Sequence, residues 1–316
     1  MEPILTEEKR KKFEKQQYRI VGRHSVVKVC SWTKQCLRGK GNCYKNTFYG
    51  IKTWRCVEMS PTWLCDHRCL FCWRDTAYAW PKWQGPIDEP KEIVDGCIKE
   101  WRDLLYGFGG SETVDKEKYK EVDKPLHFAI SLTGEPTFYP KLPELIKEIH
   151  SRGMTTFLVT NGTVPGMIQR LLDEAQPTQL YVSLVGCDKE TYEKTARPLP
   201  KDAWGNLMKT LSLIKQFNRS TIRLTMVKDI NMHEPEKYAE LIKIAQPDFI
   251  EVKGYMHIGY ARDRLKVTNM PEHNEIQEFA KKIAKLTGYH YTQEREESRV
   301  ILLEKDLSKN SIIKGL

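Results

Sequence analysis

The sequence predicts an α/β protein in which strand–helix units build an incomplete, TIM-like (βα)6 barrel. Short apolar stretches alternate with amphipathic helical patterns six times along the chain. Such repeated units require parallel strands joined by right-handed crossovers. The 316 residues exceed the ~250 residues of a typical eight-unit barrel only modestly. One large domain with a short appendage is therefore expected.

The elements follow one another in strict alternation from residue 54 onward. The expected strands are Trp54–Met59, Leu126–Leu132, Thr155–Thr160, Leu180–Val185, Ile222–Val227 and Phe249–Lys253. The expected helices are Lys91–Tyr106, Leu142–Ser151, Val164–Glu174, Trp204–Phe217, Glu234–Ala245 and Asn274–Leu286. We expect a basic N-terminal extension over residues 1–60, and a partial barrel with a C-terminal extension over residues 54–316.

All the excess positive charge lies in that extension. Residues 1–60 hold 14 Lys and Arg against 5 Asp and Glu, which accounts for the whole net charge of +9. Basic segments suit polyanionic partners, because Lys and Arg neutralise phosphates and release counterions. An exposed solubilising helix remains the alternative for the run around Lys9 to Lys15.

The N-terminal sequence also bears on location. No apolar run approaches the ~18 residues of a membrane span. The first residues, MEPILTEEKRKKFEKQQ, are charged throughout and lack the apolar region of a signal peptide. We expect a cytoplasmic protein with no membrane partner.

Nine cysteines are many for an intracellular chain, where thiols serve metals or catalysis more often than disulfides. Cys65, Cys69 and Cys72 form C-x3-C-x2-C in LCDHRCLFCWR. Three such thiolates can ligate three irons of a 4Fe-4S cluster and leave the fourth iron open to a small molecule. A structural zinc prefers four closed ligands, usually in paired C-x2-C hooks. His67 could complete a zinc site, which stays the alternative.

Strand alternation predicts a polar barrel interior. Outer faces of barrel strands pack under helices, so the polar members of each strand should point inward. A polar interior implies a bound ligand, whereas a buried ion pair of Glu251 with Lys253 or Arg223 is the alternative. The inward-pointing polar side chains are predicted to be Ser183, Arg223, Thr225, Glu251 and Lys253.

A second, dispersed cysteine set lies upstream. Cys30, Cys43 and Cys56 recur as C-x12-C-x12-C within the basic segment. Gaps this long cannot belong to one loop around one ion, but three segments can converge on a second 4Fe-4S cluster with an open iron. The spacing alone is a weak signal.

The downstream triplet, with aromatic Phe71 before its last cysteine, resembles the signature of the radical S-adenosylmethionine superfamily. That resemblance implies the (βα)6 form and S-adenosylmethionine bound at the open iron, where one electron yields a 5'-deoxyadenosyl radical. Thr133-Gly134-Glu135 resembles the Gly-Gly-Glu element that receives the amino group of this cofactor. Further cofactor-binding candidates at strand ends and in the interior are Asn161, Ser183, Arg223 and Glu251.

With the upstream cysteines included, the chain closely resembles the tRNA 4-demethylwyosine synthases. The resemblance also covers Asn42-Cys43-Tyr44-Lys45, SLTGEPTFYP, PTQLYVSL and KGYMHIGYA. It implies a carbon–carbon lyase that condenses N1-methylguanosine, beside the anticodon of tRNA-Phe, with a two-carbon unit of pyruvate. No flavodoxin-like domain precedes the motifs, so an external ferredoxin- or flavodoxin-type donor is expected. Pyruvate could be anchored by the open iron of the second cluster, or as an imine on Lys45 or Lys253.

Two other classes remain open from the sequence alone. Another radical enzyme, such as a tRNA methylthiotransferase or a glycyl-radical activase, would share the downstream motif. A non-catalytic, metal-stabilised RNA-binding protein would explain the basic front and the cysteines. For RNA, the phosphate-contact candidates are Arg10, Lys11, Lys12, Arg19 and Arg23, and the stacking candidates are Trp32, Trp73 and Trp80.

Overall fold

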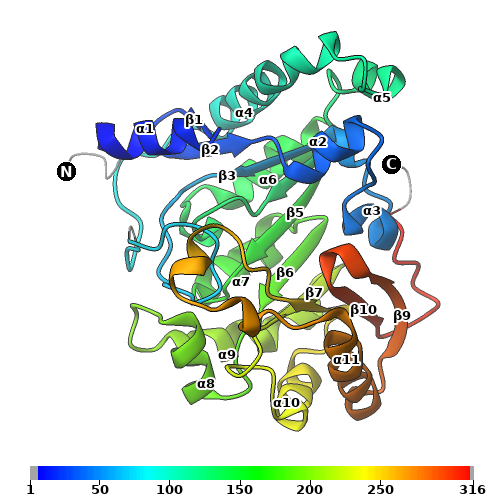
Figure 1. Ribbon diagram of the computed structural model, residues 1–316. Helices are drawn as coiled ribbons and strands as arrows, with labels where there is room; N and C mark the ends of the chain where they lie inside the picture. Colours follow the sequence, from blue (N-terminus) through cyan, green and yellow to red (C-terminus); the bar gives the residue numbers. More distant parts are fainter. Residues whose placement is uncertain (1–5, 78, 314–316) are drawn as a thin grey trace.

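The computed structural model describes residues 6–77 and 79–313 and contains one sheet of ten strands in the order β1-β2-β3-β4-β5-β6-β7-β8-β10-β9. Its centre, β3 to β8, is parallel throughout. These strands coincide with the six predicted ones, so the predicted barrel is confirmed (Figure 1). Their bounds are β3 (Cys56–Ser60), β4 (His127–Ile130), β5 (Thr155–Thr160), β6 (Gln179–Ser183), β7 (Ser220–Met226) and β8 (Phe249–Gly254).

Helices cover the outer face of this sheet, as predicted from their apolar stripes. Ile222 and Leu224 of β7, and Ile250 of β8, are buried in one large cluster with helix residues. Arg223 and Glu251 alternate with them and face the interior, which confirms the predicted strand orientation. The outer helices are α4 (Pro90–Leu105), α6 (Leu142–Ser151), α7 (Pro165–Glu174), α9 (Ala203–Leu213), α10 (Pro235–Ala245) and α11 (His273–Thr287), with the shorter α5 (Lys116–Glu121) and α8 (Lys189–Ala196).

Both edges of the sheet carry antiparallel strands that sequence patterning missed. β1 (Arg19–Val21) and β2 (Ser25–Lys28) form a hairpin beside β3, and β10 (Val300–Glu304) with β9 (His290–Arg295) extends β8. β1 has three residues and β9 has no buried ones, so neither shows a clear apolar alternation. The N-terminal extension thus shares the sheet of the barrel.

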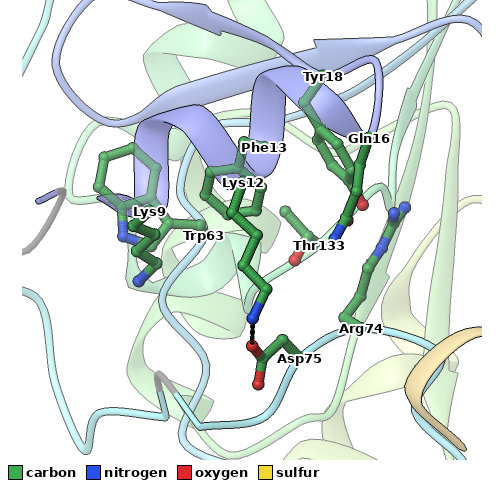
Figure 2. A pocket seen from close by; sticks show the side chains of 9 residues that line it. All are labelled: Lys9, Lys12, Phe13, Gln16, Tyr18, Trp63, Arg74, Asp75 and Thr133. Carbon is green, nitrogen blue, oxygen red and sulfur yellow. Dashed lines mark hydrogen bonds and ion pairs between the residues drawn. The ribbon is translucent and has the colours of Figure 1, made fainter. Parts of the chain in front are cut away.

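Three α-helices precede the barrel within the described residues. α1 (Glu7–Lys15) lies across the loops after β3 and β4 (Figures 1 and 2). α2 (Ser31–Leu37) and α3 (Tyr44–Tyr49) follow the β1–β2 hairpin. Aromatic residues of α3 pack against interior residues of β5, β6 and β8, so the barrel interior is aromatic as well as polar. This cluster contains Tyr44, Phe48, Tyr49, Phe157, Tyr181 and Phe249.

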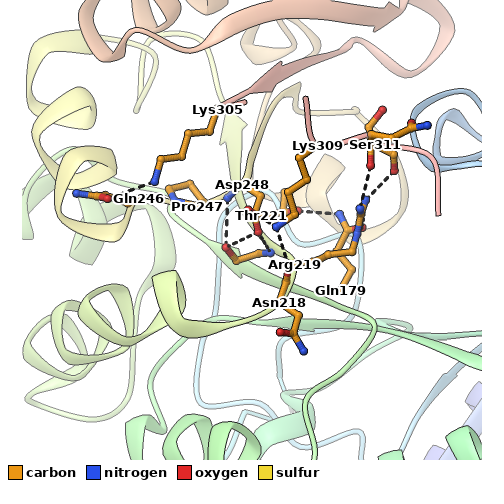
Figure 3. Close-up of polar contacts among 12 residues, drawn as sticks. Gln179, Asn218, Arg219, Thr221, Gln246, Pro247, Asp248, Lys305, Lys309 and Ser311 are labelled. Carbon is orange, nitrogen blue, oxygen red and sulfur yellow. Dashed lines mark hydrogen bonds and ion pairs between the residues drawn. The ribbon is translucent and has the colours of Figure 1, made fainter. Parts of the chain in front are cut away.

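The chain's C-terminal segment closes the end of the barrel where the parallel strands begin (Figure 3). Arg219 donates to the carbonyl oxygen of Ser311 at 2.7 Å, and Lys309 donates to Asp248 at 2.5 Å. Ile313 packs on the aromatic cluster from this side. Ligands must therefore reach the interior from the carboxyl ends of the strands, where parallel barrels carry their sites. Within the described residues, no helix is both long and apolar enough to span a bilayer.

Candidate functional site

Cys65, Cys69 and Cys72 lie in the loop that leaves β3 at the carboxyl end of the barrel, and each is half-buried. Neighbouring elements hold this loop by its backbone: the amide of Leu70 donates to Thr195 at 2.9 Å, and the guanidinium of Arg264 donates to the carbonyl of Cys72. The three thiols are thus presented by one fixed segment, as the spacing predicted.

The donor set suits a polynuclear cluster better than one ion. Among the described residues, the ligand groups whose atoms lie within 4.8 Å of one another include Cys65 with Asp66 and His67, but no second cysteine of this loop. His67 is already engaged, through Asp66 at 2.9 Å and the hydroxyl of Tyr192 at 2.6 Å. Burial raises the pKa of the Cys65 thiol, and Asp66 raises it further, so a cationic metal centre is needed to hold the thiolates.

The Thr133-Gly134-Glu135 turn supports this loop directly. Gly134 has a φ of +69°, and a Cβ there would lie 2.3 Å from the carbonyl oxygen of Thr62, which requires glycine. The amide of Glu135 donates to Leu64 at 2.6 Å. Thr133 is held through its amide by Ser60 Oγ at 2.9 Å. The turn therefore fixes the chain that enters Cys65.

The side chain of Glu135 is 2% exposed and fully engaged. Its Oε1 accepts from Thr160 Oγ1 and Thr137 Oγ1 at 2.6 Å each, and its Oε2 accepts from the amide of Asn161 at 2.8 Å. Burial nevertheless raises its pKa. The carboxylate thus braces the ends of β4 and β5 against each other.

Asn161 continues this bracing toward the cysteine loop. Its Nδ2 donates to Asp66 at 2.6 Å and contacts His67, and its Oδ1 accepts from Thr163 Oγ1 at 2.7 Å. Ser183 ends β6 in register with Arg223, and it is half-buried. The predicted cofactor-binding residues Thr133, Glu135 and Asn161 therefore gather around the first cysteine segment.

Cys30, Cys43 and Cys56 also converge, although 26 residues separate the first from the last. Cys30 precedes α2, Cys43 precedes α3, and Cys56 begins β3. Burial raises the pKa of the Cys30 thiol, and the thiols of Cys43 and Cys56 lie near enough to raise it further. Cys43 and Cys56 pack against the aromatic cluster, so this second set faces the barrel interior.

The two predicted lysines flank the second set. Lys45 Nζ lies over the rings of Tyr181 and Phe157, 4.9 and 5.3 Å from their centroids. Burial, then Arg223, lowers its pKa. Lys253 Nζ instead donates to the carbonyl of Ser298 at 2.6 Å, and burial lowers its pKa to about 8.

Arg223 and Glu251 form the buried ion pair that the sequence left as an alternative. Arg223 Nε lies 3.0 Å from Glu251 Oε2, and both carboxylate oxygens accept from tyrosines of α3, from Tyr44 at 3.0 Å and Tyr49 at 2.9 Å. Arg223 also donates to the hydroxyl of Tyr44 at 2.8 Å. This network fixes α3, and with it Cys43 and Lys45, inside the barrel.

Several basic residues predicted to contact RNA have acidic partners. Lys12 pairs with Asp75, Arg19 lies 3.7 Å from Glu100, and Arg23 lies 2.5 Å from Asp88. Arg10 and Lys11 are exposed on α1. Trp73 and Trp80, near the cysteine segment, are about two-fifths exposed, at 39% and 40%.

Two features were not predicted from the sequence: a basic hollow at the barrel mouth and the half-buried acid Glu58. The hollow, of about 560 Å³, is lined by Arg68, Arg197, Lys201 and Arg264. Arg68 lies between two cysteines of the first segment, and this position could have indicated a basic group beside the site. Glu58 lies two residues after Cys56 on the same face of β3, so strand alternation would have found it; burial raises its pKa to about 7.

Known proteins resemble the chain along almost its whole length. A family profile described as Radical SAM superfamily matches residues 59–242, and one described as Wyosine base formation matches residues 244–305. The chain is 47% identical over 310 residues to the S-adenosyl-L-methionine-dependent tRNA 4-demethylwyosine synthase of Pyrococcus abyssi, covering 96% of this chain and 90% of that protein. It is 37% identical over 317 residues to the protein of that name from Methanocaldococcus jannaschii, covering 97% and 98%.

Solved structures agree with these relatives. A structure of TYW1 with a lysine-pyruvate adduct bound superposes with a TM-score of 0.88 at 36% identity, covering 98% of this chain and 100% of that one. A crystal structure of archaeal TYW1 superposes with a TM-score of 0.80 at 33% identity, covering 98% and 100%.

Proposed function

The chain belongs to the S-adenosyl-L-methionine-dependent tRNA 4-demethylwyosine synthase family, and we propose that it condenses N1-methylguanosine of tRNA-Phe with a two-carbon unit of pyruvate. As a radical S-adenosylmethionine enzyme of tRNA modification, it uses that cofactor and a 4Fe-4S cluster. The relatives favour this activity over a methylthiotransferase, an activase or a non-catalytic RNA-binding protein.

The first cysteine segment is our candidate for the cofactor-cleaving cluster. When bound by Cys65, Cys69 and Cys72, a 4Fe-4S cluster supplies the electron that cleaves S-adenosylmethionine. The acidic surroundings of this segment, Asp66 and Glu135, suit the positive charge of that cofactor. Cofactor contacts are assigned to backbone groups of Thr133 and Gly134, to the side chains of Glu135, Asn161 and Ser183 at the carboxyl ends of the strands, and to Arg223 and Glu251 inside the barrel.

The second set, Cys30, Cys43 and Cys56, is our candidate for a second 4Fe-4S cluster, carried by the basic extension over residues 1–60. The convergence of these three thiols beside the partial barrel of residues 54–316 supports this assignment. Burial raises the pKa of the Cys43 thiol, and Lys45 and Lys253 lower it against Glu251, while Glu58 acts on Cys30 and Cys56. The two lysines suit the carboxylate of pyruvate.

Lys45 is the candidate for covalent attachment of pyruvate. Addition of its amine to the keto carbon, followed by loss of water, forms an imine. The single observation that carries this choice is the position of the amine. Lys45 Nζ donates no hydrogen bond to any of the described residues and lies over the Tyr181 ring inside the barrel. Lys253 Nζ is held by Ser298. The related structure contains a lysine-pyruvate adduct, which supports a lysine in this role.

The tRNA and electron donor are assigned by charge and by the chemistry required. Arg10 and Lys11 on α1, with the basic hollow of Arg68, Arg197 and Lys201, could contact phosphates on either side of the barrel mouth. The target base must leave its stack to reach a buried site. Electrons are supplied by a separate ferredoxin- or flavodoxin-type protein.

Anaerobic borohydride trapping with labelled pyruvate, followed by peptide mapping, tests the proposed attachment. Label on Lys45 is expected, because borohydride reduces an imine to a stable amine. Label on Lys253 would move the attachment to β8. Absence of label, together with a pyruvate-dependent change in the spectrum of the second cluster, would replace the imine with chelation.

A further inference from the structure

A small enclosed cavity separates α1 from the loops that hold the first cysteine segment (Figure 2). Its volume is about 30 Å³. Lys9 and Lys12 reach down from α1, with Trp63 beside Lys9 at one end of the cavity and Tyr18 and Arg74 at the other. Of its lining residues, only Thr133 has a role assigned above, through its backbone.

Three buried hydrogen-bond donors around the cavity have no partner among the described residues: Tyr18 Oη, Trp63 Nε1 and Arg74 Nη2. The exposed fractions of these residues are 0%, 7% and 9%. An unsatisfied buried donor is costly. Of the three residues, Tyr18 and Arg74 lie together at one end of the cavity (Figure 2), which indicates a ligand there that accepts hydrogen bonds.

The charge around the cavity selects the class of ligand. Lys9, Lys12 and Arg74 line it against one carboxylate, Asp75, which pairs with Lys12. Burial, the largest effect, lowers the pKa of Lys9 to about 7, and Asp75 opposes that shift. An anion with two or more oxygens would satisfy both the charge and the free donors.

We propose that this cavity binds a small oxyanion, a carboxylate or a phosphate, through Tyr18 and Arg74. Arg74 lies two residues after Cys72, and Tyr18 lies three residues after the end of α1. The oxyanion therefore links the chain that follows α1 to the end of the first cysteine segment. The proposal does not depend on the identity of the reaction.

Equilibrium binding of inorganic phosphate to the anaerobically reconstituted protein, at constant ionic strength, tests the site. We expect saturable binding that weakens at least about tenfold in Arg74→Gln and about fivefold in Tyr18→Phe. Tyr18→Phe removes one oxygen and keeps the ring, so its fold is retained. Lys15→Gln, an exposed cation of the same helix, is the matched control and should bind like the wild type.

Equal, non-saturating uptake by all variants would mean an adventitious ion only and would overturn the proposal, as would loss of binding in Lys15→Gln alone. Competition then identifies the source of the oxyanion. Displacement of bound phosphate by tRNA assigns the site to an RNA phosphate, and displacement by pyruvate assigns it to a free carboxylate. Either result upholds the oxyanion site.

Discussion

The two cysteine sets differ in how the chain builds them and in the charge around them. Cys65, Cys69 and Cys72 lie on one loop, whereas Cys30, Cys43 and Cys56 come from three separate elements. Burial raises the pKa of thiols in both sets. Asp66 and Glu135 raise that of Cys65 further, whereas Lys45 and Lys253 lower that of Cys43 against Glu251, and Glu58 raises those of Cys30 and Cys56. The first set thus adjoins carboxylates that suit a cationic cofactor, and the second has two lysines that suit an anionic substrate.

Removal of one ligand of the first set should have the largest effect on activity. Cys69→Ala should lower the formation of 5'-deoxyadenosine at least about 100-fold, because the cysteines of the second set face the barrel interior and cannot replace it. Cys187→Ala, a buried thiol outside both sets, is the control and should retain the activity. Native-rate cleavage by Cys69→Ala would refute the assignment of the first set.

Replacement of Lys45 should separate product formation from cleavage of S-adenosylmethionine. Lys45→Arg keeps the positive charge but cannot form an imine, so the modified tRNA should fall at least about tenfold while cleavage of S-adenosylmethionine continues. Lys253→Arg should retain most of the product, because its role is a charge contact. Mass analysis of tRNA digests and of 5'-deoxyadenosine gives both readouts. Equal losses in the two variants would remove the distinction between the lysines.

Lys9 is a buried cation beside the first cysteine segment, and its titration should make the stability of the protein depend on pH. Lys9 lies 5.7 Å from the Trp63 ring centroid and faces Lys12, Arg74 and Asp75. Burial lowers its folded pKa to about 7, below the ~10.4 of an unfolded lysine. Between these values the unfolded chain binds more protons, so stability should rise with pH, by about 1.4 kcal/mol per unit at most.

Urea unfolding at pH 7.5, 8.5 and 9.5 measures this dependence. Lys9→Met should be flatter with pH than the wild type over that range. Parallel profiles for the two proteins would show that Lys9 keeps an ordinary pKa in the fold.

A smaller effect is expected on the affinity for RNA. Replacing Arg68, Arg197 and Lys201 by Gln should reduce the slope of log affinity against log salt by about 0.7 per lost phosphate contact. The matched variant Arg10→Gln with Lys11→Gln tests the N-terminal extension in the same way. An unchanged slope in the first variant and a reduced one in the second would confine the RNA to the extension.

Local patterns were predictable because their cause lies within a few residues. The C-x3-C-x2-C loop and the strand Thr155–Thr160 each follow from adjacent residues, and the structure has this strand with the same bounds. The antiparallel strand His290–Arg295 was missed, because its pairing with Val300–Glu304 leaves it half-exposed and without alternation.

The interior of the barrel was only half predictable. Alternation placed Arg223 and Glu251 inside, but it could not show that Tyr44 and Tyr49 occupy both oxygens of Glu251. Those contacts bridge about 200 residues of sequence, and a tertiary contact of that kind leaves no local signal. Contacts between residues far apart in the sequence could therefore not be predicted from local patterns.

Iron and acid-labile sulfide, counted after anaerobic reconstitution, test the central claim that two cysteine sets hold two clusters. We expect about eight irons in the wild type and about four in each of two triple variants, one with Cys65, Cys69 and Cys72 replaced by Ala and one with Cys30, Cys43 and Cys56 replaced. About four irons in the wild type, unchanged when the second set is replaced, would contradict the claim.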